Sequence, residues 1–400
     1  MVSVSNQDVP VLKPDIFRKR LDRVREHIAK DEADLGLFFN PRTIYYLTGF
    51  RHIATERPIA ILIPADEEPI AFLPRLEVTH WEHDVSWIPE VESYFEYPDT
   101  DHPMKILASL LKERTKNQKS IGADAKGAPK YWGYEGPLLT EILKDWKFLE
   151  YSSLIPSMRI IKEPIEVELI RISARWGKRA HQILQEEVAP GKTEWDIATK
   201  ATITASQELL SEMPPPSPSM LPAFAGFRGQ IGPNSGLPHA TFKNLKVSKG
   251  DVLVTGASAD IYHYFSELER TMIVGKPSEK QRRYFKAMLD AQDAAIAAIK
   301  PEVTCAEIDK ASFSSFKENG FSHLVWHHTG HSIGLEAHEQ PFLDRGLNTP
   351  LRPGMVLTVE PGIYERGFGG FRHSDTVLVT ETGVEMLTNY PKDLRDLIIR

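Results

Sequence analysis

The spacing of hydrophobic residues predicts an alternating α/β unit over roughly the first 150 residues, a normal domain size. Residues 15–34 carry apolar side chains at helical spacing, which indicates an amphipathic helix. These side chains are Phe17, Leu21, Val24 and Ile28. Short apolar runs bounded by turn residues then indicate strands. The runs lie at 35–39, 43–49, 58–64, 69–74 and 119–124. Two more helices are expected, at 104–116 and 136–147.

A long helix is expected to open a second domain. Val167 and Ile170 follow helical spacing, and Pro164 suits the first turn of a helix, where an N–H donor is not needed. A chain of 400 residues also exceeds the size of one ordinary core. We therefore expect two domains, residues 1–156 and residues 157–400.

The second domain carries a weak internal repeat. Three residues recur at a constant offset of 111, in two segments that each resemble a turn followed by an amphipathic helix. The pairs are Pro190 and Pro301, Thr193 and Thr304, and Ile197 and Ile308. Because a strand-rich stretch follows each segment, we expect two related halves, each made of helices and a sheet.

Composition and charge limit the classes of binding partner and the cellular compartment that we expect. The formal net charge of -7 provides no broad basic surface for nucleic acid. No apolar run approaches the roughly 20 residues that span a bilayer, and the first residues lack the pattern of a secretory signal. Cys305 is the only cysteine, so no disulfide can form within the chain. We expect a cytoplasmic protein with a small-molecule substrate and no nucleic-acid or membrane partner.

Four clusters in the second domain hold residue types that could carry out chemistry. They are His239; Glu267 and Glu269; His327, His328, His331 and His338; and Glu360 with Arg372, His373, Ser374 and Asp375. Histidines and carboxylates together either bind a metal ion or work as an acid/base set. The residue types alone do not choose between these two roles.

Each cluster also has a purely structural interpretation. A lone histidine such as His239 is more often a surface or core residue than a catalyst. Glu267 and Glu269 lie two positions apart, so on a strand they share one face, which could be solvated and balanced by Arg270. Apolar runs on both sides indicate burial instead, and a buried carboxylate needs a partner. Cysteine chemistry is not expected, because Cys305 lies in a helix-like stretch.

The order of these motifs resembles the creatinase, aminopeptidase P and prolidase superfamily (M24-like). The motifs are LPHATF, GDVLV, SELERT, HHTGHSIGLEAHE, VLTVEPGIY and GGFRHSDTVLV. The resemblance implies an α/β (α+β) protein: a pita-bread C-terminal domain with an internal pseudo-repeat, preceded by a creatinase-type α/β N-terminal domain. It also implies a homodimer in which the N-terminal domain of one subunit closes the site of the other.

The metallopeptidases of this superfamily bind two metal ions through two Asp, one His and two Glu. In this chain the five positions fall on Gly256, Glu267, His331, Glu360 and Ser374. Two of these residues carry no charge, and Glu267 and Glu360 offset only half the charge of two divalent ions. We therefore expect no dinuclear centre and no metal cofactor. The alternative is a single divalent ion (Mn, Zn or Co) held by Glu267, His331 and Glu360.

Creatinase, the metal-free amidinohydrolase of the superfamily, resembles this chain more closely at the site. The resemblance implies that His239 is the general base and acid. Glu269 and Glu360 would bind and polarise a cationic, guanidinium-like group. His331 and His338 would orient that group.

Five further residues are expected to contact the substrate. They are Arg57, His327, Glu267, His373 and Ser374. Arg57 matches the creatinase arginine that comes from the partner subunit and holds the carboxylate of the substrate. Ser374 stands where creatinase has a histidine, so creatine itself is not the expected substrate. The leading hypothesis is a metal-independent hydrolase that cleaves a C–N bond in a small guanidino, amidino or related amino-acid derivative.

Two other functions stay open. One is an Xaa-Pro aminopeptidase-like or dipeptidase-like metallopeptidase with a degenerate metal site, because His327, His331 and His338 fall on positions that the peptidases use. The other is a catalytically inactive pita-bread protein that binds a partner.

Overall fold

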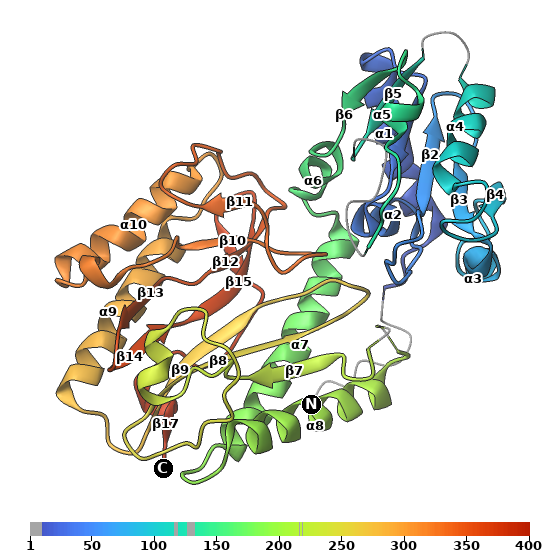
Figure 1. The fold of residues 1–400 in the computed structure, drawn as a ribbon. Coiled ribbons are helices and arrows are strands. Elements are labelled where there is room, and N and C mark those ends of the chain that lie inside the picture. The colour runs from blue at the N-terminus through green and yellow to red at the C-terminus, as the bar shows by residue number, and fades with distance from the viewer. Residues whose placement is uncertain (1–9, 116–118, 126–132, 216, 218) are drawn as a thin grey trace. The chain divides into compact units, whose positions relative to one another are not determined.

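The computed structural model describes residues 10–115, 119–125, 133–215, 217 and 219–400. They form two compact units, residues 11–158 and residues 159–400 together with residue 10 (Figure 1). The expected domain boundary after residue 156 lies within helix α6 (Leu154–Arg159). Residues 1–9, on which the expected lack of a secretory signal rests, lie outside the described residues, as does Lys116 at the end of one expected helix.

The N-terminal unit is built on a six-stranded sheet with the order β4-β3-β2-β1-β5-β6. Its strands are β1 (Leu35–Phe38), β2 (Ala60–Pro64), β3 (Ile70–Pro74), β4 (Val91–Tyr94), β5 (Ser120–Ala123) and β6 (Lys147–Glu150). Strands β1, β2 and β3 pair antiparallel, whereas the outer pairs are parallel. Buried apolar side chains of the sheet pack against helix α4 (Pro103–Arg114).

Most elements expected in this unit are confirmed. The amphipathic helix is α1 (Pro14–Lys30), which buries Phe17, Leu21, Val24 and Ile28. The helix expected at 104–116 is α4, and the expected strands other than 43–49 are β1, β2, β3 and β5. The remaining helices of the unit are α2 (Pro41–Thr48), α3 (Val78–Asp84), α5 (Leu139–Ile142) and the 3-10 helix η1 (Arg75–Glu77).

Two expected elements of this unit are wrong. Of the expected strand 43–49, residues 43–48 belong to helix α2, because Asn40 accepts hydrogen bonds from two N–H groups of the first turn. Pro41 opens this helix, and Gly49 ends it with a left-handed φ of 84°. The helix expected at 136–147 is only the single turn α5, and strand β6 follows it.

The C-terminal unit is built on a nine-stranded sheet with β15 and β9 near its middle (Figure 1). The main path is β11-β10-β12-β15-β9-β8-β7, with β16 paired to β15 and β17 paired to β9. The strands are β7 (Ala223–Gly226), β8 (Val252–Ala259), β9 (Leu268–Val274), β10 (Gly330–Ser332), β11 (Glu339–Leu343), β12 (Val356–Val359), β15 (Ser374–Val379), β16 (Val384–Met386) and β17 (Ile398–Ile399). Strands β13 (Gly362–Glu365) and β14 (Gly369–Arg372) form a separate antiparallel pair.

Four long helices pack in pairs in this unit, α7 with α8 and α9 with α10 (Figure 1). They are α7 (Pro164–Glu187), α8 (Glu194–Glu212), α9 (Glu279–Ala298) and α10 (Cys305–Glu318). The shorter 3-10 helices are η2 (Gly232–Gly236), η3 (Ser322–Leu324) and η4 (Leu394–Asp396). The expected helix start at Pro164 is confirmed. None of the helices in the described ranges combines the length and the apolar character needed to cross a bilayer.

The internal repeat has a clear structural basis. Thr193 caps the N-terminus of α8 by accepting a hydrogen bond from the N–H of Asp196. Thr304 caps α10 in the same way through the N–H of Glu307. The residues that recur at the constant offset thus form the same helix cap in each half. The expected pair of related halves is confirmed.

Candidate metal centre

Neighbouring strands of the nine-stranded sheet bring the acidic residues together. In β9, Glu269 pairs with Gly256 of β8 on one side and with Ser374 of β15 on the other. Glu267 immediately precedes β9, and Glu360 immediately follows β12. The register of the sheet thus gathers three separate sequence motifs around one point.

Glu267, His331 and Glu360 converge at that point. One ligand atom from each lies within 4.8 Å of the others. His331 Nε2 is 3.0 Å from Glu360 Oε1, yet within the described residues it is buried without an aligned hydrogen bond. His331 Nδ1 lies 3.0 Å from the carbonyl oxygen of Ser332, which can only accept, so Nδ1 carries the proton. When Nε2 is deprotonated, its lone pair is therefore directed toward the carboxylates, as in a metal-binding histidine.

The electrostatics of these three residues favour a bound cation. Burial and the charges of Glu360 and Glu269 raise the pKa of Glu267. Burial alone would lower the pKa of His331, but the nearby carboxylates of Glu360 and Glu267 outweigh burial and raise it. Without a metal ion, the two crowded carboxylates face the imidazole of His331, and the more distant guanidinium group of Arg372 acts on Glu360.

This donor set fits one divalent ion. Two carboxylates and an imidazole are ligands that Mn, Co and Zn share. Ser374 Oγ donates a hydrogen bond of 2.7 Å to Glu267 Oε1 and so orients that carboxylate. Over the described ranges, no second group of three His, Cys, Asp or Glu side chains comes together in this way.

Glu269, by contrast, is already paired with arginine. Its carboxylate receives Nε and Nη2 of Arg372 in a buried two-point ion pair, with Nη2 2.8 Å from Oε1. Nη2 of Arg228 contacts the same carboxylate. Arg372 Nε also lies 3.8 Å from Glu360 Oε2. A cationic substrate would therefore meet no free negative charge on Glu269.

His327 lies in a hydrogen-bonded chain that leads to Arg372. Arg372 Nη1 donates to the hydroxyl of Tyr364 at 2.8 Å, and that hydroxyl is 2.8 Å from His327 Nε2. His327 Nδ1 is 2.7 Å from the carbonyl oxygen of His328, so Nδ1 carries the proton and Tyr364 donates to Nε2. Burial lowers the pKa of His327 and raises that of Tyr364 to about 12, which keeps both neutral.

His338 and His239 lie on the solvent side of the cluster. The His338 ring stacks on His331 with ring centroids 3.9 Å apart, and the His338 side chain is exposed. His239 is exposed on the turn after η2. Burial and the neighbouring His331 lower the pKa of His338, and His239 is close enough to add to this effect.

Two other residues expected to contact the substrate have partners of their own. His373 is buried, with Nδ1 accepting from the N–H of Thr271 at 3.1 Å and Nε2 3.2 Å from the carbonyl oxygen of Lys392. Arg57 belongs to the N-terminal unit, where its Nε is 2.7 Å from Glu96 Oε1. The role of Arg57 in a partner's site, and the homodimer itself, stay predictions.

Sequence analysis alone does not identify Tyr364 and Arg228 as parts of the site. Tyr364 ends the motif VLTVEPGIY, so its closeness in sequence to Glu360 was a usable signal. Arg228 lies in a turn of irregular sequence before η2, and no periodicity or motif marks it. Only its contact with Glu269 reveals it.

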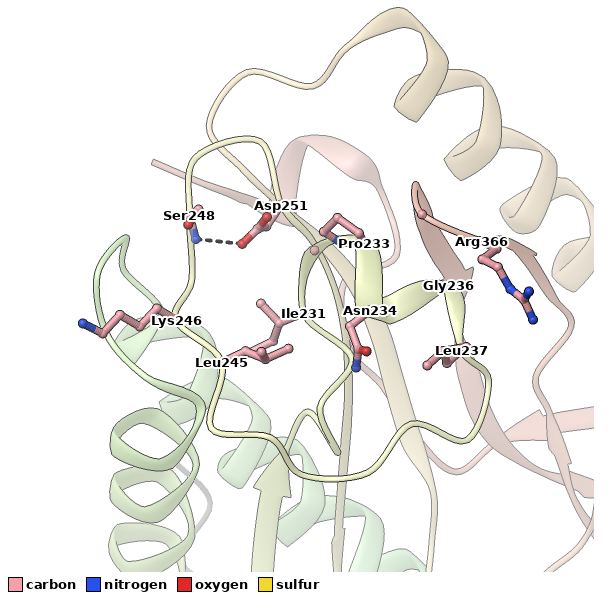
Figure 2. Close-up of a pocket in the computed structure, with 12 residues that line it drawn as sticks. Ile231, Pro233, Asn234, Gly236, Leu237, Leu245, Lys246, Ser248, Asp251 and Arg366 are labelled. Atoms are coloured by element: carbon pink, nitrogen blue, oxygen red, sulfur yellow. Dashed lines mark hydrogen bonds between the residues drawn. The ribbon is translucent and has the colours of Figure 1, made fainter.

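A cavity of about 680 Å³ lies beside η2 (Figure 2). Twelve residues from the segments 231–237, 245–251 and 366–367 line it, and the three candidate metal ligands are not among them. In Figure 2 the side chain of Lys246 points away from the cavity, and Asp251 accepts a hydrogen bond of 2.7 Å from the N–H of Ser248. This cavity is therefore not the site of the chemistry.

Two family models together match most of the chain. Residues 168–381 match metallopeptidase family M24, and residues 20–161 match the creatinase/prolidase N-terminal domain. The chain is 31% identical to a Xaa-Pro dipeptidase from Pyrococcus furiosus over 94% of this chain and 100% of that protein. It is 30% identical to a Xaa-Pro dipeptidase from Pyrococcus horikoshii over 95% of this chain and 99% of that protein.

Solved structures agree with this assignment. The prolidase from Pyrococcus horikoshii superimposes with a TM-score of 0.78 at 27% identity, covering 94% of this chain and 99% of that one. A Xaa-Pro dipeptidase from Bacillus anthracis gives 0.80 at 25% identity, covering 96% and 100%. The expected superfamily and the expected fold, a creatinase-type domain followed by a pita-bread domain, are confirmed.

The leading hypothesis about function is wrong. Relatives about as long as this chain and 30% or 31% identical to it are Xaa-Pro dipeptidases, which favours the peptidase alternative over a creatinase-like hydrolase of guanidino or amidino compounds. The site gives the physical reason. Glu269 and Glu360 were expected to bind a cationic group of the substrate together. Glu269 is not free to do so, because Arg372 and Arg228 already form ion pairs with it.

The expectation of no metal cofactor is also wrong. The matching family is one of metallopeptidases, and Glu267, His331 and Glu360 form a cluster suited to a cation. The number of charged residues at the five aligned positions underestimated the capacity of the site to bind metal. Three ligands that converge closely are enough to hold one ion.

These matches also support the broader class of activity, since a peptidase is a hydrolase of C–N bonds. The chain belongs to metallopeptidase family M24.

Proposed function

We propose that this protein is a metal-assisted peptidase that hydrolyses Xaa-Pro dipeptides. The observation that carries the proposal is the convergence of Glu267, His331 and Glu360 within 4.8 Å in the M24 part of the chain. The names of its relatives from Pyrococcus furiosus and Pyrococcus horikoshii support the substrate class.

One divalent ion would be held by the carboxylates of Glu267 and Glu360 and by His331 Nε2. When bound, such an ion polarises a peptide carbonyl group and lowers the pKa of water. Ser374 and the carbonyl group of Ser332 hold Glu267 and His331 in position. A hydrogen bond of 2.7 Å from the N–H of Glu360 to the carbonyl oxygen of Thr329 fixes the end of β12.

His338 and His239 are the groups proposed to move protons. Both are exposed on the solvent side of the cluster, and His338 stacks directly on the ligand His331. Peptide cleavage requires a proton for the leaving proline nitrogen, and an imidazole that faces both solvent and substrate can deliver it. His327 is less suited to this task, because Tyr364 already occupies its free nitrogen.

The first test is to purify the protein without chelators and measure its metal content. Hydrolysis of Ala-Pro and Gly-Pro is then followed during a titration with Mn(II). We expect about one ion per chain and activity that rises with its occupancy. A protein that binds no Mn(II) and hydrolyses neither dipeptide would contradict the proposal.

The second test removes one ligand. Glu360→Gln keeps the shape of the side chain but removes its charge, and should lower both metal affinity and kcat/KM by at least ~100-fold. The control is Glu208→Gln, which removes a glutamate that pairs with Arg179 on the surface of α8. Equal losses in the two variants would show that Glu360 has no special role.

A further inference from the structure

Arg228 lies beside the candidate metal centre with most of its hydrogen-bonding capacity unused. A guanidinium group has five N–H donors. Only Nη2 is engaged, by Glu269, and the described part of the chain supplies Arg228 with no other hydrogen bond or ion pair. The side chain is 57% exposed, so its other donors face solvent.

Glu269 does not need Arg228 as a counter-ion. Arg372 already binds both oxygens of that carboxylate and is only 3% exposed. Glu360 Oε2 also lies 3.8 Å from Arg372 Nε, but Glu360 and Glu267 are the carboxylates that a divalent ion would offset. With that ion bound, Glu269 and the two guanidinium groups leave a net positive charge at this point. A buried carboxylate that is already satisfied therefore serves to hold Arg228 in place, and the surplus charge favours an anion.

The turn that carries Arg228 is held firmly. Arg228 adopts a left-handed φ of 51°, and Gly229 follows with a φ of 74°. A non-glycine residue in this region carries a conformational cost, which persists only where the surroundings impose it. Here the buried Glu194 accepts a hydrogen bond from the N–H of Gly229, and Asn234 donates to the carbonyl oxygen of Gly229.

Gly256 leaves room for a small group beside Glu269 on the same side of the sheet. A Cβ atom built on Gly256 would meet only the side chain of Glu269 within 4 Å, with Oε1 at 3.5 Å. The missing side chain thus leaves room next to the carboxylate that anchors Arg228. Arg372, which binds the same carboxylate, also lies near the candidate metal ligand Glu360, with Nε 3.8 Å from Oε2.

We propose that Arg228 binds a carboxylate of the peptide substrate and thereby makes the enzyme select dipeptides with a free C-terminus. The inference rests on the proposed function. In an Xaa-Pro dipeptide the carboxylate lies one residue beyond the scissile bond, and a fork of guanidinium donors matches its geometry. A longer peptide places an uncharged amide at that position and leaves the donors of Arg228 unpaired.

The test compares three substrates in the Mn(II)-loaded enzyme: Ala-Pro, Ala-Pro amide and Asp-Pro amide. The wild type should prefer Ala-Pro. Arg228→Met should lower kcat/KM for Ala-Pro by about 10- to 100-fold, mainly through KM, and reduce the preference for acid over amide toward one. Arg228→Lys keeps the charge but not the fork, and should lose less. Arg179→Met, which removes a surface arginine paired with Glu208, is the matched control.

Each outcome supports or overturns a distinct claim. If the wild type hydrolyses no Xaa-Pro substrate, the proposed function fails. If it hydrolyses Ala-Pro but Arg228→Met reduces the acid and the amide equally, Arg228 has only a structural role and the inference fails. If the variant loses Asp-Pro amide more than Ala-Pro, Arg228 recognises a side-chain carboxylate, and selection of a free C-terminus is refuted.

Binding of the product provides a readout that does not depend on turnover. Proline should raise the melting temperature of the Mn(II)-loaded wild type more than prolinamide does, because only proline carries a carboxylate. Arg228→Met should abolish this difference, and its unliganded melting temperature reports whether the variant folds. An unchanged difference between proline and prolinamide in a folded variant would refute the inference.

Discussion

His181 is a fully buried residue of α7 that contacts Thr255, the neighbour of Gly256 in β8. Its Nε2 is 2.7 Å from the hydroxyl of Thr255, and that hydroxyl donates to the carbonyl oxygen of Arg270 at 2.9 Å. The Nε2 atom must therefore carry the proton. Burial lowers the pKa of His181 to about 3, so the ring stays neutral in the folded protein.

This burial predicts a pH dependence of stability. Below pH 6.5 the unfolded chain gains a proton at His181, whereas the folded protein does not until about pH 3. The contribution of His181 is thus complete above pH 6.5 and is lost as the pH falls toward 3. Between pH 7 and pH 5 the loss is about 2 kcal/mol. His181→Gln should flatten the curve of unfolding free energy in urea by that amount over this range.

The control for this measurement is His83→Gln, because the side chain of His83 is 87% exposed. It should leave the slope between pH 7 and pH 5 unchanged. A His181→Gln curve parallel to that of the wild type would show that protonation of His181 does not contribute to acid unfolding.

Among the secondary-structure elements, α2 is the one whose type was predicted wrongly. Its residues are apolar and β-branched enough to suit a strand, but Asn40 and Gly49 supply a cap at each end. Local hydrogen bonds to the backbone thus outweigh intrinsic strand preference over eight residues.

The cap of α2 gives a prediction about stability. Asn40→Ala removes the side-chain acceptor for the first turn and should lower the free energy of unfolding of the N-terminal unit by about 1 kcal/mol. Hydrogen exchange should speed up in the amides of α2. The control is Asn348→Ala, at an exposed loop position of the C-terminal unit. Unchanged exchange in α2 would show that Asn40 is not needed to start the helix.

Across the whole molecule, the candidate metal ligands all belong to one of the two units. Glu267, His331 and Glu360 lie within residues 159–400. A ligand stabilises only the part of a protein whose folded state forms its site. Metal binding should therefore act on the two units unequally.

Hydrogen exchange tests this prediction. Mn(II) at 100 times its Kd should stabilise the C-terminal unit by about 2.7 kcal/mol. Exchange should slow at the ends of β9, β10 and β12 and stay unchanged within residues 11–158. Glu360→Gln should remove the effect. Equal protection of both units by Mn(II) would argue against a site confined to residues 159–400.

Several features of this protein were determined by the sequence itself, because their physical causes are local. The helical spacing of Phe17 and Leu21 and the N-terminal Pro164 predict helices that the structure confirms. The repeated pair Thr193 and Thr304 predicts two related halves, since each threonine caps the helix that follows it. Glu267, His331 and Glu360 could be chosen as candidates because their residue types suit metal and acid/base chemistry.

Only the tertiary structure decided which charges in the site are free. Glu269 looked like an open anion in its motif, but Arg372 and Arg228, 103 and 41 positions away, occupy it. His331 and Glu360 looked like parts of an incomplete site, but together with Glu267 they form a compact ligand set. The charge available to a ligand depends on which side chains meet in space. Strand register and buried ion pairs determine these contacts between residues that are distant in sequence. No local sequence pattern predicts such contacts.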